Sequence, residues 1–166
     1  MSIKSPEDFH NKIGFIFHGI LALPLAAFVY LFLEIRHRNL QPVLSAREYF
    51  NILIGIIGVL AVIIAVAGLN AFKKEKRMVN NREGLQNKLI AYYHALTKFY
   101  IYTGVSSVVF VGGLYLTASA VFIVGYVFLL FLLSLNRPSL QKYVNDLRLT
   151  KEERDIILHK GQFSDN

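Results

Sequence analysis

The chain contains no cysteine, and only 17% of its 166 residues are charged. The absence of cysteine excludes disulfides, iron–sulfur ligation and thiolate zinc sites. The scarcity of charge argues against an ordinary soluble domain, which would interrupt its apolar runs with polar faces. The chain also lacks a phosphate-binding glycine-rich loop, an HExxH zinc-protease motif and a GxSxG nucleophile motif. These three catalytic signatures are therefore excluded.

Long uncharged apolar runs are the dominant feature that remains. They cover residues 13–33, 49–72, 99–116 and 118–135. A helix needs roughly 20 apolar residues to cross the hydrocarbon core of a bilayer, so each run is long enough or nearly so. The last two runs are too long together for a single crossing, and the turn between them is predicted at residues 117–120. The sequence thus predicts an all-α, polytopic integral membrane protein with four transmembrane helices in one domain, residues 1–166.

Basic residues lie almost entirely on one side of these runs. Of the 18 Lys and Arg residues, only Arg36, Arg38 and Arg47 lie in the first loop, and none separates the last two runs. Because short loops rich in Lys and Arg stay in the cytoplasm, we expect both termini and the second loop to be cytoplasmic. Contact with anionic lipid headgroups explains the net charge of +7 more economically than nucleic acid does. The bacterial inner membrane is the expected location.

The second loop, residues 73–98, is predicted to form a helical hairpin that extends the second and third spans into the cytoplasm. Turn-forming residues occupy positions 80–84, and apolar residues then recur every three or four positions. The tyrosines at 92, 93, 100 and 102 suit the headgroup zone. In the tail, residues 136–166, we expect two short helices on the membrane surface or against the hairpin. The second of them should begin at a capping box at 150–153, and a similar box at 45–48 should start the second span.

Small residues recur at helical spacing in the first two spans. They are Gly19, Ala22 and Ala26 in the first span, and Gly55, Gly58, Ala61, Ala65 and Gly68 in the second. Lipid supplies no hydrophobic drive between helices, so small residues favour association by letting backbones approach closely. We expect the second span to be the packing centre of the bundle.

Few residues in the spans suggest chemistry. The spans contain no Asp, Glu, Lys or Arg, which argues against a proton-coupled transporter or pump. His18 is expected to make a buried polar contact across the bundle, although a proton relay, a haem ligand or a quinone contact are alternatives. Thr103, Ser106 and Ser107 would either line a small pathway or serve ordinary helix packing, which we favour. We expect no catalytic residue, metal or cofactor.

A basic cluster follows the second span: Lys73, Lys74, Lys76 and Arg77. We interpret the basic cluster as a determinant of topology that contacts headgroups, with an acidic partner or ribosomal RNA as the alternative. The pattern as a whole favours a non-catalytic accessory or scaffold subunit that packs against other membrane protein subunits. A small oligomeric transporter or channel using the polar face of the third span is one alternative. A membrane enzyme or cofactor protein using His18 is another.

Overall fold

A computed structural model of the chain describes residues 3, 5–37, 42–43 and 49–159. These residues form helices and loops without any strand, so the predicted all-α class is confirmed for them. The helices are α1 (Pro6–Arg36), α2 (Phe50–Val79), α3 (Leu85–Thr117), α4 (Ala120–Leu135), α5 (Leu140–Asp146) and α6 (Lys151–Leu158). The capping box predicted at 45–48 lies outside the described residues.

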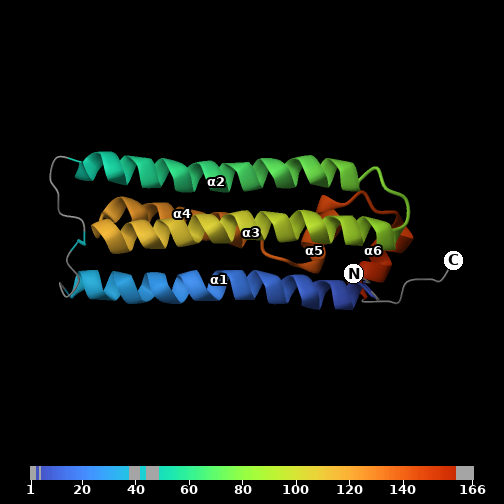
Figure 1. Ribbon diagram of the computed structural model, residues 1–166. Coiled ribbons are helices and arrows are strands. Elements are labelled where there is room, and N and C mark those ends of the chain that lie inside the picture. Colours follow the sequence, from blue (N-terminus) through green and yellow to red (C-terminus); the bar gives the residue numbers. More distant parts are fainter. Residues whose placement is uncertain (1–2, 4, 38–41, 44–48, 160–166) are drawn as a thin grey trace.

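The three longest helices run side by side, with α3 between α1 and α2, and α4 folds back along the second half of α3 (Figure 1). The start of α1, the end of α2, the start of α3 and the short helices α5 and α6 gather at one end of the molecule, called the hairpin end below (Figure 1). Helices α1, α2 and α3 are each long and apolar enough to cross a membrane. A fourth candidate is α4 taken with α5, although this pair is bent by 80°. This composition indicates a membrane-embedded protein.

Two turns connect the helices close to where the sequence places them. Helix α2 continues past its apolar run to Val79, and α3 begins after Gly84, whose φ of 79° is readily adopted without a Cβ. The second turn lies at Ala118, which has a left-handed φ of 50°. Ser119 then caps α4 by accepting a hydrogen bond from the backbone of Val121. The hairpin turn is therefore readable from local sequence, whereas the turn at 117–120 follows from the length of the uncharged stretch.

The expectation that the second span is the packing centre is wrong, because α3 occupies that position. Half of the most apolar 18-residue window of α3 is buried, compared with 11% for α2 and 22% for α1. Polar side chains explain the difference, since in lipid they need partners inside the protein. Ser106 is fully buried and donates a 2.8 Å hydrogen bond to the carbonyl of Ala61 in α2. The exposed surface of α2 consists largely of large aliphatic side chains, which suits it to contact with lipid.

The small residues of α2 serve this α2–α3 interface in part. Ala61 and Ala65 are buried against α3. Gly68 lies so close to α3 that an added Cβ would be 2.6 Å from the Cβ of Tyr102. Gly55 and Gly58, nearer the start of the helix, have open space where a Cβ would stand. The predicted face is thus divided, with its second half used inside the chain.

Candidate functional site

The hairpin end contains a carboxylate that joins three helices. Asp146, at the end of α5, accepts a 2.6 Å hydrogen bond from the hydroxyl of Tyr92 in α3. The Nζ of Lys76 in α2 lies 2.7 Å from its other oxygen, and Lys142 in α5 contributes a second ion pair at 3.2 Å. The side chain of Asp146 is only 11% exposed, and Tyr92 is completely buried. This arrangement holds α2, α3 and α5 together.

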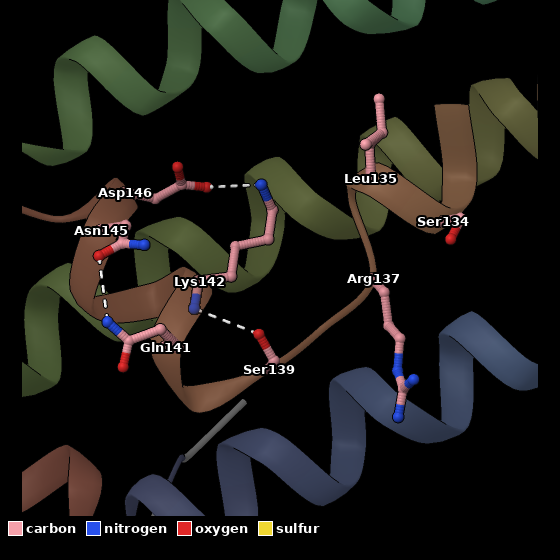
Figure 2. A pocket seen from close by; sticks show the side chains of 8 residues that line it. All are labelled: Ser134, Leu135, Arg137, Ser139, Gln141, Lys142, Asn145 and Asp146. Atoms are coloured by element: carbon pink, nitrogen blue, oxygen red, sulfur yellow. Dashed lines mark hydrogen bonds and ion pairs between the residues drawn. The ribbon is translucent and has the colours of Figure 1, made fainter. Parts of the chain in front are cut away.

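Local sequence explains why these groups meet. Tyr92 belongs to the buried stripe of α3 that also contains Leu89 and Leu96, so its side chain points into the molecule. Ser139 caps α5, accepting a hydrogen bond from the backbone of Lys142, and thereby orients the short helix (Figure 2). Asp146 then stands one helical turn after Lys142, where an i,i+4 pair is geometrically favourable.

Electrostatics at this site keep Asp146 ionised. Burial by itself would raise the pKa of its carboxyl, but hydrogen bonds from Lys76 and Tyr92 and the charge of Lys142 outweigh that effect and lower the pKa. The pKa of the Tyr92 phenol is raised far above its usual value by burial first and by the adjacent Asp146 charge second. Burial also raises the pKa of Tyr143. Tyr92 therefore stays protonated and acts as a permanent hydrogen-bond donor.

A second buried ion pair attaches α6 to α3. The Nζ of Lys88 donates to both carboxylate oxygens of Glu153, at 3.0 and 2.9 Å, and to the carbonyl of Arg148 at 3.1 Å. Glu153 also completes the capping box with Thr150, which confirms the helix start predicted at 150–153. One carboxylate thus starts α6 and attaches it to the hairpin.

Aromatic side chains complete the core of the hairpin end. Tyr143 of α5 is buried, packs edge-on against Phe9 of α1 with ring centroids 4.9 Å apart, and shares a 3.0 Å hydrogen bond with the Nδ1 of His10. Tyr92 and Tyr100 are fully buried inside the protein, and the headgroup level predicted for these tyrosines stays a prediction. They face inward because they follow the same helical stripe as the leucines of α3.

Two cavities flank the pair formed by Lys142 and Asp146. The first has a volume of about 520 Å³ and follows the α4–α5 connection, where Lys142 reaches toward Asp146 and Arg137 points away from both (Figure 2). The second has a volume of about 410 Å³ and lies between the end of α2 and the start of α5. Its lining is Leu69, Phe72, Lys73, Lys76, Arg77, Asn80, Asn136 and Lys142.

The structure divides the predicted basic cluster. Lys76 is half-buried and paired with Asp146, whereas Lys73, Lys74 and Arg77 are exposed. The positions follow from helix geometry, because residues 69, 72 and 76 share the inner side of α2. The cluster therefore has one structural member and three that are free to contact an outside group.

His18 is exposed on α1, so the buried polar contact expected there is wrong. Its ring lies edge-on to Phe17, and it makes no hydrogen bond to the described part of the chain. Phe17 takes the inward position, packing on Tyr100, and an adjacent helical residue is rotated about 100° away. The described residues also contain no group of three or more His, Asp or Glu arranged to hold a metal ion.

Of the other residues singled out in the sequence, one set is exposed and the other is buried. Gly19, Ala22 and Ala26 are exposed on α1. Thr103, Ser106 and Ser107 are all buried, and the Thr103 hydroxyl donates to the carbonyl of Phe99 at 2.7 Å. Thr103 and Ser106 thus have protein partners in the packed interface.

No protein-family model, curated protein or solved structure matches this chain. The roles assigned to the residues of the hairpin end therefore rest on geometry alone. Sequence reasoning missed Asp146, Lys142, Lys88 and Glu153 as a structural group. One signal was available, because Asp146 is the only acidic residue between Glu83 and Glu152. A single carboxylate in a stretch rich in Lys and Arg is a candidate to pair with several of these cations at once.

Proposed function

We propose that this chain is a four-span protein of the bacterial inner membrane, with its termini and hairpin end in the cytoplasm. We further propose that it acts as a non-catalytic accessory or scaffold subunit of a larger membrane complex. The bias of Lys and Arg supports this orientation, because the residues of the second loop and the tail belong to the hairpin end. The spans α1, α2 and α3 would be joined by α4 as the fourth.

Helix α4 is the shortest of the four proposed spans. Its 16 residues correspond to about 24 Å at 1.5 Å per residue, less than a hydrocarbon core of roughly 30 Å. A short span is accommodated when the bilayer thins locally or flanking residues reach toward the interface. Ser119 at one end and Asn136 and Arg137 at the other are suited to that role.

The observation that carries the subunit proposal is the uncovered small-residue face of α1. Gly19, Ala22 and Ala26 are exposed, and Gly19 also borders an apolar cavity of about 370 Å³ between α1 and α3. Leu23 on α1 and Gly104 on α3 contribute to the same cavity. A transmembrane helix of a partner subunit can approach such a face closely and gain dispersion contacts.

The transporter alternative has less support. A pathway along α3 would need polar side chains directed at an open space, but Thr103 and Ser106 are buried and donate to backbone carbonyls. The alternative based on His18 would place its chemistry on the outer surface of α1. A subunit interface is the function that uses the exposed features of the spans.

Copurification tests the subunit proposal. The chain would be purified from its native membranes in mild detergent, and attached proteins would be identified by mass spectrometry. We expect one stable membrane partner, lost when Ala22→Leu and Ala26→Leu are combined. Ala67→Leu makes the same kind of change at an exposed position of α2 and should retain the partner. Recovery of a lone monomer from wild-type membranes would contradict the proposal.

Cysteine accessibility tests the orientation, because the natural chain has no cysteine to interfere. A single Asn81→Cys in the hairpin turn should react with a membrane-impermeant maleimide only after the inner membrane is opened. Val43→Cys, in the first loop, should react in intact spheroplasts. The reverse labelling pattern would refute the proposed topology.

A further inference from the structure

The cavity between α2 and α5 combines positive charge with an apolar floor. Its cations are Lys73, Lys76 and Arg77 from α2 and Lys142 from α5. The only carboxylate in contact with any of these four within the described chain is Asp146, which pairs with Lys76 and Lys142. Lys73 and Arg77 have no ion-pair partner there. The cavity thus keeps two uncompensated cations in its wall.

The position of the cavity along α2 restricts what can fill it. Leu69 and Phe72 lie in the last turn of the uncharged run, whereas Lys73 and Arg77 lie in the following turn. In the proposed membrane orientation this is the boundary between hydrocarbon and headgroups. An occupant must therefore present a negative charge and a hydrogen-bond acceptor to the upper part of the cavity and an apolar chain to the lower part.

We propose that this cavity binds the phosphate headgroup of an anionic phospholipid from the cytoplasmic leaflet. Lys73 and Arg77 contact the phosphate oxygens. Asn80 and Asn136 also line the cavity, and their amides donate to the backbone carbonyls of Asp146 and Leu132. The acyl chains start at Leu69 and Phe72 and continue along α2. Lys76 and Lys142 hold the wall in place through Asp146 and add to its positive potential. The inference rests on the proposed membrane embedding and is independent of the subunit role.

A lipid fits this cavity better than the other sources of negative charge. Free phosphate would leave the apolar floor formed by Leu69 and Phe72 exposed. An acidic segment of a partner protein would satisfy the cations but would have to carry its polar backbone to hydrocarbon depth, where unsatisfied backbone groups are costly. A phospholipid supplies the anion and the apolar chain in one molecule and is present at high concentration beside the cavity.

Competition between lipids in a purified system tests the inference. The full chain would be reconstituted into nanodiscs containing equal amounts of phosphatidylcholine and phosphatidylglycerol, then released and weighed by native mass spectrometry to count retained lipids. Lys73→Gln combined with Arg77→Gln removes the two unpaired cations. Lys74→Gln combined with Arg82→Gln removes two exposed charges outside the cavity and is the matched control. Circular dichroism would confirm that both variants remain helical.

We expect wild type and the control to retain phosphatidylglycerol over phosphatidylcholine. The cavity variant should lose that preference by about thirtyfold, since it lacks two cations that are each worth roughly 1 kcal/mol near an anionic surface. Equal retention in both variants would overturn the proposal. Displacement of the retained lipid by inorganic phosphate would also overturn it. Because the assay contains no partner subunit, its result is independent of the accessory role. Release of the chain from native membranes by alkaline carbonate would instead refute the embedding itself.

Discussion

The hydroxyl of Tyr92 donates a 2.6 Å hydrogen bond to Asp146, which follows it by 54 positions in the chain. This contact links the start of α3 to the end of α5, and Lys76 adds α2 to the same carboxylate. The uncharged stretch from 99 to 135 lies between the two residues. Helix α3 runs away from the hairpin end and α4 returns toward it, so residues far apart in the sequence meet there and hold that end together.

Removing the Tyr92 hydroxyl should weaken the hairpin end. We expect Tyr92→Phe to lower the free energy of unfolding by about 1–3 kcal/mol, because a buried charged acceptor loses a donor. Thermal unfolding in detergent, followed by circular dichroism, measures the change. Tyr93→Phe is the matched control, since the Tyr93 hydroxyl makes no hydrogen bond within the described residues and its loss should cost little. Equal destabilisation by both variants would contradict this account.

Acid should destabilise the protein through Asp146. Its pKa is lowered in the folded protein, so its contribution is complete above the ordinary carboxyl value of 3.8 and is lost as pH falls through the lowered folded value. As the pH falls below 3.8, wild type should therefore lose stability more steeply than Asp146→Asn does. Unfolding measured at several pH values compares the two proteins. Parallel curves would show that the carboxylate does not carry the effect.

Two lysine ion pairs should differ strongly in importance. Lys88 and Glu153 have side chains only 10% and 15% exposed, and Lys88→Ala leaves Glu153 buried without its cation. We expect a loss of about 3–5 kcal/mol in the free energy of unfolding. Lys98 pairs with Glu75 at 2.5 Å, but its side chain is 60% exposed, so Lys98→Ala should cost far less than Lys88→Ala. Denaturant titration of both variants checks the order, and a reversed order would contradict it.

Two glycines of α2 should respond differently to the same substitution. Gly68→Val places a side chain against Tyr102, where even a Cβ lies 2.6 Å from its neighbour, and should separate α2 from α3. We expect a destabilisation of about 1–3 kcal/mol from overpacking. Gly58→Val meets open space and should have little effect on the isolated chain. Thermal stability in detergent distinguishes them, and similar melting temperatures would disprove the close approach.

Local patterns predicted most of the helical framework. The turn after Val79 and the capping box at Thr150 depend on neighbouring residues, and the turn at Ala118 follows from the length of the uncharged stretch, so the sequence alone reveals them. The inward direction of each span was harder to predict. In a soluble helix the polar face marks the outside, but in these spans nearly every side chain is apolar, and hydrophobicity does not separate lipid from protein. His18 and the role of α3 were misjudged for that reason.

By itself the sequence determined the helical class, the apolar runs, the asymmetric distribution of basic residues and the principal turns. Tertiary structure alone decided that α3 lies at the centre and that Asp146 contacts Tyr92, Lys76 and Lys142 together. It also decided that Lys73 and Arg77 have no ion-pair partner among the described residues. The physical reason is one of range. Helix formation and capping depend on residues within one or two turns, whereas ion pairing and burial depend on how distant helices rotate against one another.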